Sequence, residues 1–223
     1  NIFQRPLEKI LRSLLVHKNA SLSVLTGDAT ALTTATKEEA TLDSAMRNLE
    51  VLEKSLGNSL QFTQDGLAKR KREEAKIDNF SRKWDQCRKF WQTMTPEACK
   101  NEHDNLIKIV RMMITHLGDT SNLILDPDLD SFYMVDVSLV ALPSAQERIS
   151  TLVTIYNSLI KNGEKDQEDK LALAIQIALF QQSDLDRIFS SIDTALNEDN
   201  NFYGKSESLQ KNISVPLEKF KKS

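Results

Sequence analysis

The chain has 223 residues, of which 40% are hydrophobic and 27% are charged, and it contains only 6 glycines and 5 prolines. A chain of this length buries roughly 70–75% of its unfolded surface, and the scarcity of helix-breaking residues predicts long helices around a sizeable core. The formal net charge of −3 provides no surplus of positive charge to displace counterions from nucleic acid, which argues against a nucleic-acid partner.

Apolar residues recur every three to four positions, the spacing of helices that each turn one face to a shared core. In chain order, this period and the capping residues predict helices over 3–26, 36–94, 97–122, 127–162, 165–197 and 204–222. The second is either continuous or broken within 57–66, where two glycines coincide with weak periodicity. No stretch shows a strand pattern. The predicted fold is all-α, an elongated antiparallel bundle of about six helices over 1–223, in one layer or as two stacked four-helix modules.

Three apolar stripes identify the expected core faces. They are Ile77, Phe80, Trp84, Cys87, Trp91 and Met94; then Leu106, Ile109, Val110, Met113 and Leu117; and last Leu171, Ile175, Ala178, Gln182, Leu185, Phe189, Ile192 and Leu196. The segment 171–180 is apolar enough for a buried strand, but its alanines and its place in a heptad run favour a helix. Each stripe is therefore expected to belong to a core-facing helix.

Capping residues set the expected helix ends. Thr95 followed by Pro96 suits an N-cap and first helical position, and Asp126 followed by Pro127 suits the same arrangement. Pro143 is expected to kink or split the fourth helix, because it lacks a backbone donor and crowds the preceding turn. An even number of helices would return both chain ends to one end of the bundle.

The most unusual stretch is SNLILDPDLDSFYMVDVSLVALP, in which three aspartates occupy alternate positions. These are Asp126, Asp128 and Asp130. A calcium loop has this spacing, but it needs glycine at its sixth position and glutamate at its twelfth, where this chain has Ser131 and Val137. The favoured interpretation is that Asp126 caps a helix whose first turn is stabilised by the neighbouring acids.

The two cysteines, Cys87 and Cys99, lie on either side of the turn predicted at 94–96. At a rise of 1.5 Å per residue they are roughly 11 Å and 6 Å from that turn, a marginal geometry for a disulfide, whose Cα atoms lie within about 7 Å. A disulfide is feasible if the first helix ends by Phe90. Otherwise Cys87 is a small buried apolar side chain within its stripe.

The sequence predicts no catalysis, no metal and no cofactor. Its three histidines, His17, His103 and His116, are too widely spaced for a zinc pattern. It has no glycine-rich phosphate loop, nucleophile elbow or zinc-protease helix. It also has no run of about 20 apolar residues that could span a bilayer.

The aspartate-rich stretch resembles a block typical of all-helical extracytoplasmic sensor domains in bacterial transmembrane receptors, both methyl-accepting chemotaxis proteins and sensor histidine kinases. That block usually reads S-N-L-x-L-D-P-D-L-D-S-Y-Y-L-M-D and is followed by L-P. Here Phe132 replaces the first tyrosine and Tyr133 keeps the second. Met134 and Val135 replace Leu-Met before Asp136.

Two further segments are similar to the same family. LLVHKNASLSVLTGDATA resembles the family's helix with an H-R-G-x-S motif, in which His17 fits, Lys18 replaces arginine and Asn19 replaces glycine. EHDNLI resembles the short H-x-x-L-I stretch that precedes the main block. The resemblance covers roughly residues 10 to 143, and beyond them the chain matches only in being helical.

The resemblance implies a periplasmic sensor domain looped out between two transmembrane helices of a cytoplasmic-membrane protein, with histidine kinase or chemotaxis signalling domains in the cytoplasm. Both chain ends would then lie at one end of the bundle. The expected partner is a small-molecule ligand or a periplasmic binding protein that carries one, and a homodimer is compatible with this arrangement. A displacement of ~1–2 Å between the first and last helices would transmit the signal.

On this hypothesis, the candidate ligand-binding residues are polar side chains close to the apolar stripes. They are Lys18, His103, Asn122, Asp130 and Tyr133. For each, the alternative is a helix cap or a satisfied hydrogen bond between helices. The alternative for the whole chain is a structural or dimerisation helical module that senses nothing directly.

Overall fold

The computed structural model describes residues 2–121, 128–161, 167–200 and 204–222, and the statements below concern these residues. They form helices and turns with no strand, which confirms the predicted all-α class. If each of the two rods that continue through a π turn is counted once, the described residues form eight helices, so the expected number of about six is too low. None of the described helices is long and apolar enough to cross a lipid bilayer.

The first group of helices comes from the N-terminal half of the chain. It contains α1 (Gln4–Leu25), α2 (Leu32–Leu56), α3 (Gln64–Lys69), α4 (Ile77–Phe90) and α5 (Pro96–Thr120). Helix α1 packs against α2 and α5, and α4 packs against α5 and α2. The predicted cap of α5 is confirmed, because the Thr95 hydroxyl accepts a hydrogen bond from the amide of Ala98 at 3.2 Å, with Pro96 opening the helix.

The predicted helix over 36–94 is broken, and the break at 57–66 is confirmed. Helix α2 ends at Leu56, and α3 begins only after a turn in which Gln61 has φ of 53°. Lys71 has φ of 55° and separates α3 from α4. Left-handed residues interrupt a right-handed helix, so these two positions divide the segment.

The second group comes from the C-terminal half. One rod consists of α6 (Leu129–Asp136), the π turn η5 (Val137–Ala141) and α7 (Leu142–Lys161). The next consists of α8 (Gln167–Leu179), the π turn η6 (Phe180–Leu185) and α9 (Asp186–Asn197), and α10 (Glu207–Lys221) follows. Helix α6 packs against α9, and α7 packs against both α8 and α1.

The kink or split predicted at Pro143 is instead a π turn, η5, just before this residue. Proline has no N–H to donate to the carbonyl four residues earlier, which belongs to Leu139. That carbonyl accepts a hydrogen bond from Nη1 of Arg111 in α5 at 3.4 Å. The neighbouring Ser138 carbonyl accepts one from Nε2 of Gln4 in α1 at 3.3 Å. The rod is therefore not split, and its altered turn is tied to the first group.

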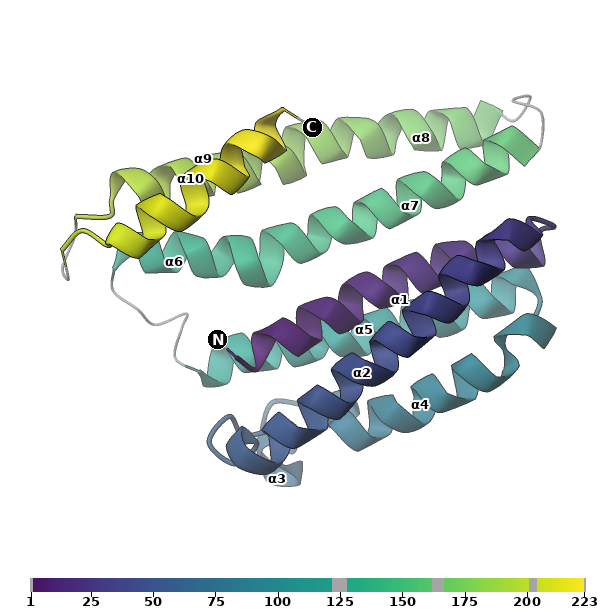
Figure 1. Cartoon of the computed structure of the whole chain (residues 1–223), viewed down its shortest axis with the longest axis horizontal. Coiled ribbons are helices and arrows are strands. Elements are labelled where there is room, and N and C mark those ends of the chain that lie inside the picture. Colours follow the sequence, from purple (N-terminus) through teal and green to yellow (C-terminus); the bar gives the residue numbers. More distant parts are fainter. Residues whose placement is uncertain (1, 122–127, 162–166, 201–203, 223) are drawn as a thin grey trace.

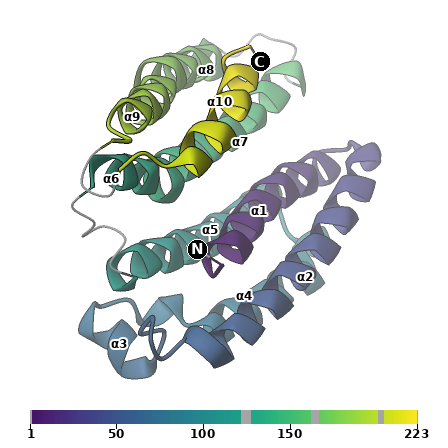
Figure 2. The same ribbon diagram turned by 60° about the vertical axis from the view of Figure 1, so that its left-hand side comes forward.

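Figures 1 and 2 show the two groups lying side by side along their length, so the stacked arrangement of two modules is not what the described residues form. A uniformly antiparallel bundle is also not confirmed. Helices α1 and α7 run in the same direction, because Gln4 contacts Ser138 and Ser23 contacts Asn157 with the same separation of 134 residues.

The expectation that the chain ends meet at one end of a single bundle is wrong for the described residues. Helix α1 belongs to the first group, and α10 ends partway along the second (Figure 1). The two terminal helices therefore belong to different groups.

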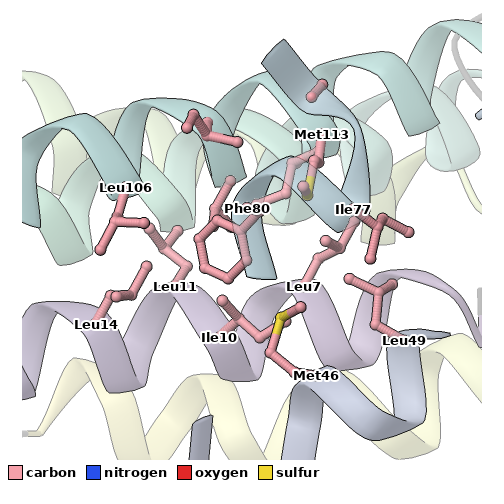
Figure 3. Close-up of a cluster of buried hydrophobic side chains, with 14 of the residues drawn as sticks. Leu7, Ile10, Leu11, Leu14, Met46, Leu49, Ile77, Phe80, Leu106 and Met113 are labelled. Carbon is pink, nitrogen blue, oxygen red and sulfur yellow. The ribbon is translucent and has the colours of Figure 1, made fainter. Parts of the chain in front are cut away.

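Each group has its own apolar core. In the first, side chains from α1, α2, α4 and α5 interdigitate, as Figure 3 shows for Leu11, Phe80 and Leu106. The stripes predicted in α4 and α5 line this core as far as Cys87. Trp91 lies in a smaller neighbouring cluster with Ala20, Ala35 and Cys99, and Met94 is only partly buried against that cluster. The second core lies between α9, α10 and the rod around η5, and includes Ile188 and Leu217.

The third predicted stripe is wrong in its first half. Helix α8 has no buried residue, and Leu171 and Ile175 are 63% and 49% exposed. Among the described helices it packs chiefly on α7. Beyond the π turn η6 the prediction holds in part. Ile192 is buried and Phe189 and Leu196 pack partly buried against the second core, but α9 also buries Ile188 and Ala195, which the predicted spacing did not include.

Gly66 in α3 provides a test of the break between α2 and α4. A Cβ atom added there would lie 2.3 Å from the backbone oxygen of Gln61, which the left-handed turn holds in place. We expect Gly66→Ala to lower the free energy of unfolding by about 1–3 kcal/mol, measured by urea denaturation. Gln64→Ala, at an exposed position of the same turn, is the control. Equal stabilities of the two variants would contradict this geometry.

Candidate functional site

The two groups of helices meet along α1 and α7, and several polar side chains join them there. We call this contact the seam. Its hydrogen bonds join Gln4 to Ser138, Asn19 to Ser150 and Thr154, and Ser23 to Asn157, at 3.0–3.4 Å. From the second group, Leu139 joins the first core and Val135 packs partly buried against it. The two cores are otherwise separate clusters.

A hollow of about 570 Å³ lies on one side of the seam, lined by residues of α1, α5, α7 and α8. We call it the polar cleft. Its charged residues are Lys18, Lys108, Arg111, Arg148, Asp104 and Glu147. Four of these are cationic and two are acidic, so the lining has a surplus of positive charge.

Lys18 occupies the deepest charged position of the polar cleft. The residue is only 6% exposed, and its Nζ lies 3.1 Å from Oδ1 of Asp104. Lys100 lies 2.8 Å from the other oxygen of Asp104. Burial alone would raise the pKa of Asp104, but the hydrogen bonds and charges of Lys100 and Lys18 outweigh it and hold the pKa below its ordinary value. This carboxylate therefore stays charged and orients Lys18.

Arg111 bridges the two groups across the cleft. Its Nε lies 2.9 Å from Oε1 of Glu147 in α7, and its Nη2 donates to the Ser144 hydroxyl at 3.2 Å. Burial raises the pKa of Glu147, and the charge of Arg111 opposes that rise. The Arg111–Glu147 pair is thus a charged contact between α5 and α7 in a partly desolvated setting.

Arg148 forms the opposite wall of the cleft. Its Nε pairs with Asp184, a buried carboxylate in the π turn η6, and its Nη1 donates to Oε1 of Gln176 in α8 at 2.9 Å. Lys108 is exposed at the mouth and makes no ion pair within the described ranges. A small anion entering the cleft would meet these two cations together with Arg111.

A buried polar network lies behind the cleft, inside the first core. The Nδ1–H of His103 donates to the carbonyl of Cys99 at 2.7 Å, which leaves Nε2 of His103 to accept from Nδ1 of His17 at 2.7 Å. The other nitrogen of His17 faces Oε1 of Glu39 at 3.3 Å, and Nε1 of Trp91 donates to the same oxygen at 2.9 Å. Burial, followed by the neighbouring His17, lowers the pKa of His103 to about 4.

Both cysteines contact the same imidazole and are free thiols. Sγ of Cys99 is 3.6 Å from Nδ1 of His103, and Sγ of Cys87 is 4.0 Å from both ring nitrogens. Helix α4 does end at Phe90, the condition that favoured a disulfide, yet the bond is not formed in this structure. Burial is the main cause that raises the pKa of Cys87 to about 12 and of Cys99 to about 11. The thiols therefore pack as small apolar side chains.

No group of three or more histidine, cysteine or acidic side chains is arranged to hold a metal ion in the part of the chain that the structure describes.

The five predicted ligand residues do not lie together in one site. Lys18 lines the polar cleft, whereas His103 is fully buried and points into the first core. Asp130 and Tyr133 lie in α6, away from the cleft, where the Tyr133 ring packs edge-on against Phe132 and Asp130 lines a shallow hollow against α10. Asn122 lies outside the described residues, so its predicted role stays a prediction.

The predicted cap residues Asp126 and Pro127 also lie outside the described residues. Helix α6 begins at Leu129, and Asp128 precedes it in an extended conformation.

Four charged residues of the polar cleft were not predicted from the sequence: Asp104, Arg111, Glu147 and Arg148. These residues carry no motif, because charged residues on helices are ordinarily solvated. The adjacent pairs His17–Lys18 and His103–Asp104 held a usable signal. In each pair one side chain enters the core and the next one enters the cleft.

Comparisons of this chain with protein-family models, with curated proteins and with solved structures gave no match.

Proposed function

We propose that this chain is the extracytoplasmic signal-sensing domain of a bacterial transmembrane chemoreceptor or sensor histidine kinase, and that it binds a small anion in the polar cleft. The observation that carries this proposal is the convergence of four cationic side chains from both helix groups in a hollow of about 570 Å³ at the seam. A hollow of this size is within the range of small-molecule sites. Its surplus of positive charge favours an anionic ligand.

The seam supplies the mechanism. A ligand shifts an equilibrium only if it binds one arrangement better than the other. An anion held by both Arg111 of α5 and Arg148 of α7 favours the arrangement in which these two side chains are close. The expected response is a displacement of ~1–2 Å between α7 and α1, the size of known helix shifts in such transitions.

The resemblance of the aspartate-rich block to bacterial sensor domains supports the same function. On this proposal the ligand arrives free or on a periplasmic binding protein, and flanking helices hold the receptor in the cytoplasmic membrane. The domain itself performs no catalysis. In an elongated bundle of this kind, the seam would run along the length of the domain. A shift of α7 would then displace α8, which packs against it.

Thermal unfolding tests the polar cleft directly. Acetate, succinate, glutamate, phosphate, nitrate and benzoate are screened one by one, and an anion that fits is expected to raise the melting temperature. At 100 times its dissociation constant it adds ~2.7 kcal/mol, or about 5–10 °C for a chain of this length. Arg148→Gln and Arg111→Gln are expected to remove most of the shift. Arg47→Gln, at an exposed position in α2, is the control.

If none of these anions changes the melting temperature, or if the shift survives in both cleft variants, the cleft is not the sensing site. A structural or dimerisation module is then the better account. The observation that favours it is the apolar, exposed surface of α8, with Leu171 and Ile175 at 63% and 49% exposure. A molecular mass that doubles with concentration would support that account.

A further inference from the structure

A second hollow, of about 430 Å³, lies on the other side of α1, between α1, α2 and α7. We call it the apolar cleft. Its apolar lining includes Leu15, Val16, Ala20, Ile149 and Val153. Ile149 and Val153 are 45% and 38% exposed, so a ligand in this hollow would remove apolar surface from water. Such burial is the main driving force for binding in clefts of this kind.

Two polar side chains lie at one end of the apolar cleft. Helices α1 and α7 run in the same direction, because every hydrogen bond of the seam joins residues 131–135 positions apart. Arg12 and Gln146 both line the cleft and differ by 134 positions in the sequence, so they lie at the same level.

Both of these side chains have unused hydrogen-bonding capacity. Oε1 of Gln146 is buried and has no hydrogen-bond partner. A buried acceptor without a donor is costly, and a ligand that supplies the donor removes that cost. Arg12 is exposed at the mouth and makes no ion pair among the described residues. Its guanidinium is therefore available to a carboxylate.

We propose that the apolar cleft binds a 2-hydroxy carboxylic acid with an apolar side chain. The carboxylate pairs with Arg12, and the hydroxyl on the adjacent carbon donates to Oε1 of Gln146, because the two protein groups lie at one level. The side chain extends between Val16 and Val153. A cavity of about 150 Å³ holds benzene, so 430 Å³ accommodates a ring together with a three-carbon acid.

The neutral hydroxyl is preferred to an ammonium group at this position. An ammonium would lose its hydration against a neutral amide oxygen, with no carboxylate lining the apolar cleft to compensate for the charge. The corresponding amino acid is therefore expected to bind more weakly than the hydroxy acid.

This site is separate from the polar cleft and does not rest on the proposed function. Leu15 is the residue that lines both hollows in the described chain. A ligand can therefore bind at one of them whether or not the other is used.

Calorimetric titration of the whole chain with 3-phenyllactate and three analogues tests the chemistry. 3-Phenylpropionate lacks the hydroxyl, 3-phenyl-1,2-propanediol lacks the carboxylate, and phenylalanine replaces the hydroxyl with an ammonium group. We expect 3-phenyllactate to bind most tightly and each analogue to bind about tenfold more weakly, the effect of one lost polar contact.

Protein variants then assign the contacts. Gln146→Leu should weaken binding of 3-phenyllactate about tenfold and leave 3-phenylpropionate unchanged, because only the first compound uses the amide oxygen. Arg12→Gln should weaken both acids and leave the diol unchanged. Val153→Trp should fill the hollow and prevent binding of all four. Arg5→Gln, at an exposed position of α1 outside the lining, is the matched control.

Three outcomes overturn the proposal. The first is that 3-phenyllactate does not bind, or binds no better than 3-phenylpropionate. The second is that its affinity is the same in Gln146→Leu and Arg12→Gln as in the unmodified chain. The third is that Arg148→Gln abolishes its binding, which would place the compound in the polar cleft. If no anion raises the melting temperature and none of these three outcomes occurs, only the proposed function is contradicted.

Discussion

Acidification from pH 6.5 to pH 4 is expected to lower the free energy of unfolding by about 3 kcal/mol through His103 alone. In the folded chain, burial and the neighbouring His17 lower the pKa of His103 from 6.5 to about 4. At 1.36 kcal/mol for each unit of pKa, that difference corresponds to about 3 kcal/mol. The ring is fully buried, so solvent screens this effect little.

The sign follows from which state binds the proton. Well above pH 6.5 the imidazole is neutral in both states, and its contribution to stability is complete. Between pH 6.5 and about 4, His103 is protonated in the unfolded chain but stays neutral in the folded chain. The free energy of unfolding therefore falls as the pH falls. The low pKa of His103 in the folded chain has a structural reason. Both ring nitrogens of His103 are already engaged, Nδ1 as donor to Cys99 and Nε2 as acceptor from His17.

Urea denaturation at pH 7 and pH 4 measures the effect, and His103→Gln isolates it. The variant removes the titrating group and keeps the other acids nearby, including Glu39 and Asp104 with their lowered pKa values. The stability difference between the two proteins should shrink by about 3 kcal/mol on acidification. Parallel curves would show that His103 takes up its proton freely in the folded state.

Trp84→Ala is expected to lower the free energy of unfolding by about 3–5 kcal/mol, the cost of truncating a large buried aromatic side chain. Trp84 is 2% exposed in the first core. Its indole N–H donates to Oδ1 of Asp43 in α2 at 3.0 Å, and its ring lies edge-on to His17 with centroids 5.2 Å apart. The substitution therefore leaves a cavity where three helices meet.

Phe90→Ala is the matched control, because it also removes an aromatic ring from α4. Phe90 is 48% exposed and lies under the ammonium of Lys89 at 5.2 Å. We expect it to cost less than about 1 kcal/mol. The measurement is denaturation followed by circular dichroism, because removing one of the two tryptophans changes the fluorescence signal. Similar losses for both variants would show that the predicted stripe of α4 does not face the core.

Much of the fold can be predicted from residues that act on their own helix. The stripe of α4, the cap at Thr95 and the break after Leu56 are local patterns, and the structure contains all three. The stripe predicted through α8 and α9 holds only in part beyond η6, because a regular helical period does not account for the extra residue of a π turn. It failed in α8 because a helix can be apolar on faces that no other helix covers.

The candidate site, too, could be predicted from the sequence only in part. Lys18 could be chosen from the sequence because it stands at the basic position of the segment that resembles the H-R-G-x-S motif, and it lines the polar cleft. Arg111 and Glu147 could not, because they are 36 positions apart and each has the sequence context of a solvated residue. Their pairing requires α7 to lie alongside α5 across the seam.

The sequence by itself determined the all-α class, most helix faces and the capping of α5, because these depend on neighbours within a few turns of one helix. Only the tertiary structure decided that the helices form two groups with separate cores, and that two hollows lie on either side of α1. These features depend on which helices lie next to each other, and contacts between distant residues leave no periodic trace in the chain.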